Sequence, residues 1–295
     1  MPNITGHTEL VGLMAYPIRH TQSPTTHNLA YDKNGDDVIQ LAFEVDNDSL
    51  EAAVNSIRAL RMLGSNISMP NKTVVHKYLE EVDEAAELCG AINTVVNTRD
   101  ENGQVTGRLK GYNTDGMGYW QGIKEEGIDY KRMKMVLIGT GGAATAIAVR
   151  GALDGIAEMH VFNIKDQFYS RGEEIVEKIN SNTACRAYMH DLADLELLKE
   201  KMQEADLFCD ATGVGMHPME ELSNIPDPSF FRPDLIVTDT VYAPRETVMM
   251  KQAKEAGCAR VYNGMAMMLF QALIAIELYT GKLTDTAYMK EQLGI

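Results

Sequence analysis

The second half of this 295-residue chain alternates strand-like and helix-like segments almost without a break. Parallel strands need a long crossover between them, and a helix normally supplies it. The alternation therefore predicts an α/β fold with a parallel sheet covered by helices on both faces. The six strand candidates are 133–138, 159–162, 186–189, 207–210, 235–239 and 260–262.

A glycine-rich turn follows the first of these strands. The apolar run MVLI ends at Ile138 and leads into GTGGAA, residues 139–144, before a helical segment. Glycine permits the tight turn and lets backbone N–H groups approach a pyrophosphate at the helix N-terminus. Because a strand precedes the turn and a helix follows it, the pattern predicts a dinucleotide-binding site, with a purely structural turn as the alternative.

The end of the next strand bears on which dinucleotide is bound. It runs into Asn163, Ile164, Lys165 and Asp166. A carboxylate at Asp166 can accept from both ribose hydroxyls of NAD and would repel the 2′-phosphate of NADP. At ~4 Å and an effective dielectric of ~20 this repulsion is about 4 kcal/mol, which Lys165 offsets in part. NAD is therefore predicted over NADP, although Asp166 could instead cap a helix starting near Gln167.

The first half of the chain is less regular. Its strand candidates are 10–14, 41–45, 92–96 and 105–109, and DENG at 100–103 predicts a hairpin turn between the last two. Helices are predicted from an N-cap at Ser23 to Gly35, from a capping box at 48–51, and from Pro70 onward. Two further helices, 265–279 and 284–293, end the chain, and a glycine-rich turn at 112–118 is the expected domain boundary.

Composition excludes several classes of function. With 27 basic and 42 acidic residues the formal charge is −15, which argues against a nucleic-acid partner. Apolar runs are too short for a membrane span, and the N-terminal stretch lacks the basic and apolar regions of a signal peptide. The four scattered cysteines form no CxxC pair. We therefore expect a cytoplasmic protein with reduced thiols, no metal site and no membrane association.

Two charged residues in the first half are candidates for proton chemistry. The segment SMPNK puts Lys72 in the first turn of the helix predicted from Pro70. A cation there opposes the helix dipole, which helps it to give up a proton. Asp115 in GYNTDG is the second candidate. The alternatives are a solvated surface lysine and an aspartate that only caps the following helix.

Eight segments, in this order, resemble the shikimate dehydrogenase family. The resemblance covers nearly the whole chain, and FEVDND together with the Asp166 position looks most like the quinate/shikimate dehydrogenase branch. The eight segments are PIRHTQSPTTHN, SMPNK, GAINT, GYNTDG, GTGGAA, ATGVGM, VYAPRET and NGMAMMLFQA.

The resemblance implies two domains and a reaction. Residues 1–115 and 265–295 would form the substrate-binding catalytic domain, and 116–264 a Rossmann-type NAD-binding domain. Hydride would pass between NAD(H) and C3 of shikimate or 3-dehydroshikimate, and of quinate or 3-dehydroquinate in the same branch. Lys72 would exchange a proton with the C3 oxygen, and Asp115 would orient the lysine. A positioned cation that donates a proton suits an alkoxide formed by carbonyl reduction.

The resemblance also assigns binding residues. Substrate contacts are implied for Thr21, Ser23, Ser68, Asn93, Thr114, Tyr242 and Gln271. Contacts to the dinucleotide are implied for Gly139, Thr140, Gly141, Gly142, Ala143, Asn163, Ile164, Lys165, Asp166, Gly213, Thr240, Val241, Tyr242, Ala243 and Gly264.

Several positions depart from the family pattern and leave alternatives open. Thr21 stands where the family usually has serine, Ser68 where many members have threonine, and Gln40 where the branch tends to have tyrosine. A paralogue acting on another polyol or amino-cyclohexene carboxylic acid is the main alternative, and a nucleotide sensor without turnover is another. Ile164 replaces the usual arginine and Gly213 a frequent lysine, which favours NAD while NADP remains the alternative cofactor. A homodimer is compatible with the sequence, which does not fix the oligomeric state.

Overall fold

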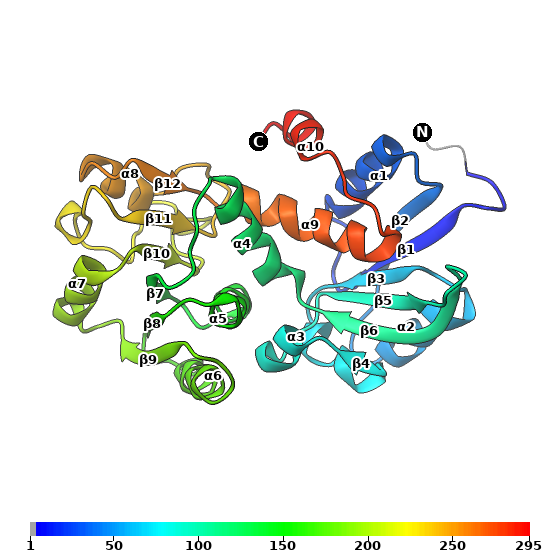
Figure 1. Ribbon diagram of the computed structural model, residues 1–295, viewed down its shortest axis with the longest axis horizontal. Helices are drawn as coiled ribbons and strands as arrows, with labels where there is room; N and C mark the ends of the chain where they lie inside the picture. Colours follow the sequence, from blue (N-terminus) through cyan, green and yellow to red (C-terminus); the bar gives the residue numbers. More distant parts are fainter. Residues whose placement is uncertain (1–3) are drawn as a thin grey trace. The chain divides into compact units, whose positions relative to one another are not determined.

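The computed structural model describes residues 4–295, so the first three residues of the N-terminal stretch lie outside it. The chain divides into two compact units. Unit 1 ends at Gly118 and is completed by Leu269–Ile295, and unit 2 is Tyr119–Met268. The chain passes between them inside two helices, α4 (Thr114–Glu125) and α9 (Met265–Thr280), labelled in Figure 1. The prediction of a glycine-rich turn at the first boundary is therefore wrong, because a continuous helix occupies that position.

Unit 2 is built on a six-stranded sheet whose paired strands are all parallel. Its order is β12-β11-β10-β7-β8-β9, the doubly wound arrangement in which strand order reverses beside the first strand, β7. The strands are β7 (Lys134–Ile138), β8 (Glu158–Asn163), β9 (Arg186–Asp191), β10 (Leu207–Asp210), β11 (Ile236–Asp239) and β12 (Arg260–Tyr262). The predicted parallel sheet is confirmed.

Helices cover both faces of this sheet, as Figure 1 shows. They are α5 (Gly142–Asp154), α6 (Tyr169–Asn182), α7 (Leu195–Glu204) and α8 (Val248–Glu255), with a short 3-10 helix at Pro228–Phe230. Strand residues such as Val136, Phe162 and Phe208 are fully buried between the two helical layers. Burial on both faces explains why the inner strands β7, β10 and β11 are mainly apolar rather than alternating, whereas the edge strands β9 and β12 are partly exposed.

Unit 1 contains a mixed sheet with the order β2-β1-β3-β5-β6-β4. The predicted hairpin is confirmed, since β5 and β6 pair antiparallel. The other neighbouring strands are parallel except for the antiparallel β3–β5 pair. The strands are β1 (Glu9–Ala15), β2 (Val38–Glu44), β3 (Gly64–Ile67), β4 (Glu81–Val82), β5 (Thr94–Arg99) and β6 (Val105–Tyr112). Strands β3 and β4 were not predicted from the sequence.

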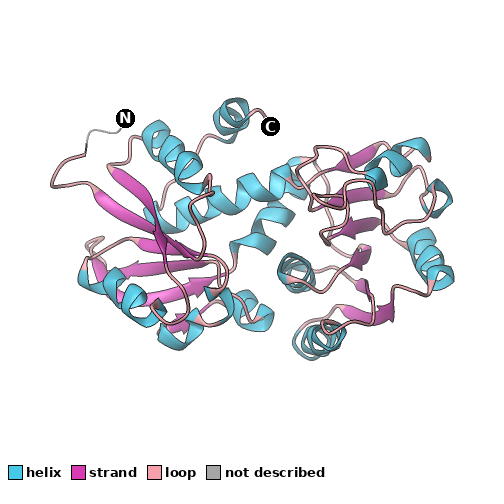
Figure 2. Cartoon of the chain, turned by 180° about the vertical axis from the view of Figure 1, so that it is seen from behind, coloured by secondary structure: helices cyan, strands magenta, loops and turns pink. Residues whose placement is uncertain are grey.

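Helices lie on either side of the unit 1 sheet (Figure 2). They are α1 (Ser23–Asn34), α2 (Leu50–Ala59), α3 (Glu84–Cys89), α9 and α10 (Thr286–Leu293), with 3-10 helices at Asn71–Thr73 and Val75–Tyr78. The main apolar core is formed by residues such as Val54, Ile57 and Leu109, which are fully buried.

Four details of helix ends differ from prediction. Gln22 is the N-cap of α1, so Ser23 is already its first helical residue, although Gly35 does end the helix as predicted. The Ser49 hydroxyl hydrogen-bonds Asp46 and caps no helix, so the predicted capping box is wrong. Two short 3-10 helices follow Pro70 in place of the predicted α-helix. Helix α6 begins at Tyr169, later than expected, and has no side-chain cap.

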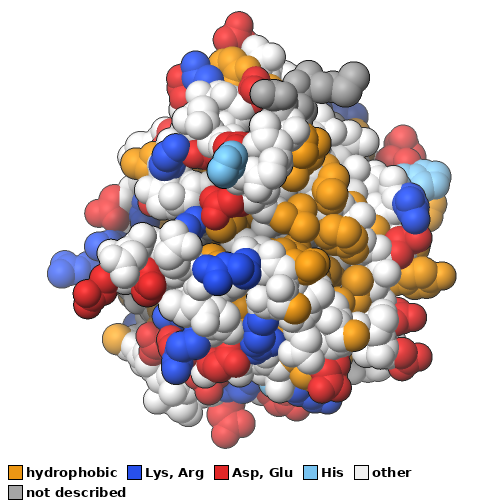
Figure 3. Space-filling view, turned by 90° about the vertical axis from the view of Figure 1, so that its right-hand side faces the viewer, with side chains coloured by type: hydrophobic (Ala, Val, Ile, Leu, Met, Phe, Trp, Pro, Cys, Tyr) orange, Lys and Arg blue, Asp and Glu red, His pale blue; other side chains and the backbone are white. Residues whose placement is uncertain are grey.

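The four cysteines are buried and free of disulfides, as expected. Within residues 4–295 no helix is long and apolar enough to cross a membrane, and no group of three His, Cys, Asp or Glu side chains could hold a metal ion. On the face seen in Figure 3, basic and acidic side chains intermingle around one area where hydrophobic side chains gather.

Candidate active site

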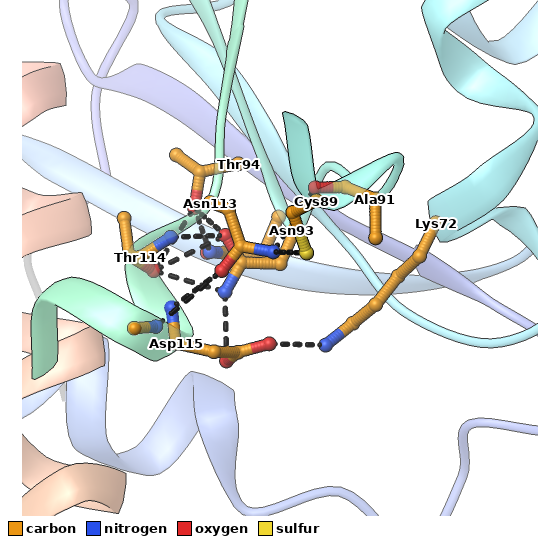
Figure 4. Close-up of polar contacts among 10 residues, drawn as sticks. Lys72, Cys89, Ala91, Asn93, Thr94, Asn113, Thr114 and Asp115 are labelled. Carbon is orange, nitrogen blue, oxygen red and sulfur yellow. Dashed lines mark hydrogen bonds and ion pairs between the residues drawn. The ribbon is translucent and has the colours of Figure 1, made fainter. Parts of the chain in front are cut away.

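The predicted catalytic pair is in direct contact. Lys72 Nζ donates to Asp115 Oδ2 at 2.8 Å, and the two side chains are 25% and 19% exposed (Figure 4). Asp115 lies in the first turn of α4, where the helix dipole favours a carboxylate. Lys72 lies in the three-residue 3-10 helix that follows β3, so the α-helix dipole expected to act on it is absent.

Asn93 holds the carboxylate of this pair from the other side. Its Nδ2 donates to Asp115 Oδ1 at 2.8 Å and to Thr114 Oγ1 at 3.0 Å. Its Oδ1 accepts from the Thr114 backbone N–H at 2.8 Å. Asn113 caps α4, because its Oδ1 accepts from the Asp115 N–H. Both oxygens of Asp115 are therefore engaged, and the capping role considered for Asp115 belongs to Asn113.

A further run of hydrogen bonds continues from Asn93 through the interior of unit 1. Thr94 Oγ1 donates to Asn93 Oδ1 at 3.0 Å, and Asn66 Nδ2 donates to Thr94 Oγ1 at 3.3 Å. Gln40 Nε2 donates to Asn66 Oδ1 at 2.8 Å, and Ser23 Oγ donates to Gln40 Oε1 at 3.0 Å. We call Ser23, Gln40, Asn66, Thr94, Asn93 and Asp115 the buried polar chain. It connects Ser23, which the resemblance assigns to the substrate carboxylate, with Asp115, which the resemblance assigns to Lys72 and a ring hydroxyl.

The remaining substrate candidates of unit 1 are Thr21 before α1, Ser68 after β3 and Gln271 in α9. Thr21 Oγ1 accepts from the Ser23 backbone N–H at 3.2 Å. Ser68 is half-buried directly after β3, and its N–H donates to the Met14 carbonyl at 3.0 Å. Gln271 lies in α9, whose backbone comes so close to α4 at Gly118 that a Cβ there would meet Gln271 N at 2.4 Å. Lys72 also lines a cavity of about 370 Å³.

The glycine loop of unit 2 joins β7 to α5 at the point where strand order reverses. Gly139 has φ +111°, which favours glycine, and Gly141 is the N-cap of α5. A Cβ added at Gly141 or Gly142 would meet nothing within 4 Å. Thr140 is buried, and its Oγ1 donates to the Phe168 carbonyl at 3.1 Å, while Ala143 is half-buried in the first turn. The helix N-terminus thus faces open space, as an anion site requires.

The residues predicted to surround the adenosine ribose follow β8. Asn163 Nδ2 donates to Asp166 Oδ1 at 3.3 Å, and the Phe168 N–H donates to the same oxygen at 2.8 Å. Ile164 is exposed. Lys165 Nζ lies 3.3 Å from Asp191 Oδ2. The Ala193 N–H, and then Lys165, hold the pKa of Asp191 below its ordinary value.

The residues predicted for the nicotinamide side lie at the carboxyl ends of β10 and β11. Thr240, Val241, Tyr242 and Ala243 line a cavity of about 120 Å³ together with Thr212 and Met216. Gly264 packs so closely that a Cβ would lie 2.0 Å from the Thr240 carbonyl oxygen, so only glycine fits there. Gly213 has no such neighbour. Tyr242 is about half exposed and belongs to unit 2, so its role toward the substrate remains a prediction.

Two buried carboxyl groups at the ends of β10 and β11 were not predicted from the sequence. Asp210 and Asp239 end neighbouring strands in register and are each 2% exposed. Asp239 accepts from the Val241 N–H at 2.8 Å and from Thr247 Oγ1 at 2.7 Å. Burial, and then the nearby Asp210 carboxylate, raise the pKa of Asp239 to about 7. Their place at strand ends, next to ATGVGM and VYAPRET, was the available signal.

These features define a two-unit α/β protein with a Rossmann-type unit and a lysine–carboxylate pair in its other unit. The chain belongs to the shikimate dehydrogenase family. The family model described as the shikimate dehydrogenase substrate binding domain matches residues 13–95. This range includes strands β2, β3 and β4 of the unit 1 sheet, together with Lys72 and Asn93.

Named relatives extend the similarity to nearly the full chain. The chain is 49% identical over 290 residues to shikimate dehydrogenase (NADP(+)) of Listeria monocytogenes serotype 4b (strain F2365), covering 98% of this chain and 97% of the relative. It is 44% identical over 292 residues to quinate/shikimate dehydrogenase of Escherichia coli (strain SMS-3-5 / SECEC), covering 99% of each. A crystal structure of shikimate 5-dehydrogenase from Listeria monocytogenes, in complex with shikimate and NAD, matches with a TM-score of 0.94 at 48% identity over 99% of both chains.

Proposed function

We propose that this chain is an oxidoreductase that transfers hydride between a nicotinamide dinucleotide and C3 of shikimate or 3-dehydroshikimate. Quinate and 3-dehydroquinate are the second pair of substrates, in keeping with the relative named for both acids. The observation that carries the proposal is the Lys72–Asp115 contact at 2.8 Å, with Asn93 holding the second oxygen of Asp115. This arrangement fixes the Lys72 ammonium group in place as a proton donor.

The chemistry assigned to this chain is proton transfer and charge stabilisation. When bound, the nicotinamide supplies the hydride or accepts it. Reduction of the ketone develops negative charge on the C3 oxygen, and the Lys72 ammonium stabilises this charge and donates its proton there. In the oxidation direction the neutral amine of Lys72 accepts the proton of the C3 hydroxyl. Asp115 orients Lys72 through Oδ2 and bonds a ring hydroxyl of the substrate.

A cyclic polyol acid requires many hydrogen-bonding partners, and unit 1 offers hydroxyl and amide groups for them. In this proposal Thr21 and Ser23 bind the carboxylate, and Tyr242 is also assigned to the substrate. Ring hydroxyls are bound by Ser68, Asn93, Thr114 and Gln271. An assay with related acids distinguishes this assignment from an enzyme for another polyol or amino-cyclohexene carboxylic acid.

The glycine loop fits a dinucleotide. The N-terminus of α5 is open because Gly141 and Gly142 leave the space above it free of side-chain atoms. The loop residues 139–143 would bind the pyrophosphate, and residues 163–166 would surround the adenosine ribose. The nicotinamide side would be lined by Gly213, Thr240, Val241, Tyr242, Ala243 and Gly264.

We propose NAD as the preferred cofactor, with NADP as the weaker one. Asp166 would bond the ribose hydroxyls of NAD, and its charge would repel a 2′-phosphate. Lys165, the nearest cation in the sequence, lies against Asp191. The relative that is 49% identical carries NADP(+) in its name, whereas the matching crystal structure contains NAD. The kcat/KM ratio of the two cofactors therefore has to be measured on this chain.

The test is an absorbance assay of reduced nicotinamide with shikimate or quinate and with NAD⁺ or NADP⁺. We expect turnover that is faster with NAD⁺, and Lys72→Ala should lower kcat by about 10²–10⁴-fold, as loss of a general acid–base group does. Binding of NADH should survive in this variant. Lys77→Ala, an exposed lysine on the next 3-10 helix, is the matched control.

Two outcomes would change the assignment. Unaltered turnover in Lys72→Ala would remove the lysine from the chemistry. A folded wild type that binds NADH but oxidises neither acid would favour a different cyclic acid or a sensor without turnover. A homodimer and a cytoplasmic location stay predictions, which light scattering and cell fractionation would test.

A further inference from the structure

Gln40 is the second member of the buried polar chain, directly after Ser23, and is itself completely buried. Its Oε1 accepts from Ser23 Oγ at 3.0 Å, and its Nε2 donates to Asn66 Oδ1 at 2.8 Å. The backbone of Gln40 is held separately, because Asn28 Oδ1 accepts from its N–H and Asn28 Nδ2 donates to its carbonyl. The side-chain amide can therefore turn without moving strand β2.

We propose that Gln40 is a positioning residue that sets whether the Ser23 hydroxyl donates or accepts a hydrogen bond, and that a bound carboxylate reverses the direction of the buried polar chain between Ser23 and Thr94. This inference rests on the proposed function, in which Ser23 contacts the carboxylate of a cyclic acid. It deepens that function, since it names the residue that selects an anionic group over a neutral one.

The present direction of the chain does not suit an anion. A serine hydroxyl has one proton, and Ser23 uses it toward Gln40 Oε1. Only the oxygen lone pairs of Ser23 are then available to a ligand. An ionised carboxylate also offers only acceptors, so the two groups cannot bond until Ser23 releases its proton from Gln40.

Reversal of the chain frees that proton without leaving a buried group unpaired. If the Gln40 and Asn66 amides turn over, Gln40 Nε2 donates to Ser23 and Asn66 Nδ2 donates to Gln40 Oε1. Thr94 then donates to Asn66 Oδ1 instead of Asn93 Oδ1. Asn93 Oδ1 still accepts from the Thr114 N–H at 2.8 Å, so its hold on Asp115 is kept.

Burial makes these two directions the favourable ones. A polar group left without a partner in a buried site is unfavourable, so a half-turned chain is disfavoured. Gln40 is 0% exposed, Thr94 0% and Asn66 7%. The members therefore turn together, and ligand charge at Ser23 decides between the two directions.

The test is Gln40→Glu, measured with shikimate and with its carboxamide. At a pH high enough to ionise a glutamate in this buried site, residue 40 accepts from Ser23 and cannot donate to it, so Ser23 is fixed as a donor to residue 40. The carboxamide can still donate its own N–H to Ser23. We expect the ratio of kcat/KM for the acid to that for the amide to fall about tenfold or more, the effect of one hydrogen bond to a charged group. The change should lie in KM for the acid, with kcat and the dinucleotide KM nearly unchanged.

A double-mutant cycle separates this effect from simple charge repulsion. In the Ser23→Ala background, Gln40→Glu should lower the ratio little further if it acts through Ser23. If Gln40→Glu lowers this ratio equally with and without Ser23, the proposal is overturned. Equal losses of kcat/KM for the acid and the amide would also overturn it, because they indicate a structural role. Gln104→Glu, an exposed site in the same unit, is the matched control for the added charge.

Failure of the proposed function is visible separately. A wild type that binds the acid but does not turn it over would refute the proposed reaction. The double-mutant cycle would then be measured with the dissociation constants of the acid and the amide in place of kcat/KM. A wild type that binds neither ligand would overturn both proposals. If Gln40→Glu melts at the wild-type temperature but the ratio of acid to amide does not change, the result counts against the role of Gln40 and leaves the proposed function intact.

Discussion

Asp239 shows how burial can make a single carboxyl group pH-sensitive. It ends β11 at 2% exposure, next to Asp210 on β10. Thr247 Oγ1 donates to the ionised carboxyl and could accept from the protonated one, so both states keep a partner. Because the folded pKa is about 7 and the unfolded value about 3.8, the folded protein binds the proton more tightly.

This raised pKa makes the stability of the protein depend on pH. Between about pH 4 and pH 7 Asp239 holds its proton more in the folded than in the unfolded state, so its contribution to the free energy of unfolding falls as pH rises. A tenfold difference in proton affinity between the folded and unfolded states corresponds to about 1.4 kcal/mol. Asp239→Asn should remove this contribution, so its free energy of unfolding in urea, relative to that of the wild type, should rise between pH 4 and 7 and exceed it at pH 8. Asp129→Asn, an exposed site in unit 2, is the control, and identical curves for wild type and Asp239→Asn would refute the prediction.

The sequence identified most residues of the candidate site but not how they are linked. Lys72 and Asp115 are 43 residues apart in the chain and in contact, which the resemblance implied and local reasoning could not. Asn66 and Thr94 stand inside or beside segments that the analysis singled out, yet strand residues reveal their neighbours only once the sheet register is known. Ser23 was interpreted as a cap because Ser-Pro commonly begins a helix.

At the level of elements, the glycines of the β7–α5 loop have different physical roles. Gly139 has φ +111°, and a Cβ there would lie 3.0 Å from the Ala211 carbonyl oxygen. Gly141 has φ −73° and ψ −176°, values that any residue adopts, and a Cβ there would meet no atom within 4 Å. The first glycine is required by the fold, and the second is not.

This difference predicts opposite results for two alanine variants. Gly139→Ala should destabilise unit 2 by roughly 1–3 kcal/mol, because the added Cβ is strained at positive φ. Gly141→Ala should leave the melting temperature unchanged and weaken NADH binding by on the order of tenfold, since its Cβ would occupy the pyrophosphate site. Calorimetric melting and NADH titration measure the two effects. Unweakened NADH binding in Gly141→Ala would place the pyrophosphate elsewhere.

Elements with strong local signals were predicted well, and those that depend on tertiary contacts were not. The parallel strands of unit 2, whose inner members are apolar runs, were predicted to within a few residues. β3 reads Gly-Ser-Asn-Ile, with neither alternation nor β-branched residues until its end, yet all four residues are buried at the centre of the sheet. The segment after Pro70 has a helical pattern, but its turns are 3-10.

At the level of the molecule, each unit has its own apolar core, and a single tryptophan reports on one of them. Trp120 is 1% exposed in unit 2, where its indole N–H donates to the Ile147 carbonyl at 2.9 Å. Tyr279 of α9 is equally buried in unit 1. Its ring packs on the β3 backbone so closely that a Cβ at Gly64 would lie 2.6 Å from it.

Tyr279→Ala should therefore destabilise unit 1 selectively. Loss of a buried aromatic side chain costs about 3–5 kcal/mol. In urea, the circular dichroism of the variant should begin to fall at lower concentration, while Trp120 fluorescence keeps its wild-type midpoint. Phe208→Ala, in the unit 2 core, should instead shift the fluorescence midpoint. Equal shifts of both signals in Tyr279→Ala would mean that the two units unfold as one cooperative block.

The division of unit 1 between the two ends of the chain has a consequence for synthesis on the ribosome. All of Tyr119–Met268 is made before the part of α9 from Leu269 onward, which covers β3, so unit 2 can reach its final form first. The first 118 residues must meanwhile keep their sheet without Tyr279, Ile276 and the rest of the buried face of α9. Unit 1 is thus the part that folds last although its strands emerge first, and the interval in between is when a nascent chain of this protein is most exposed to aggregation.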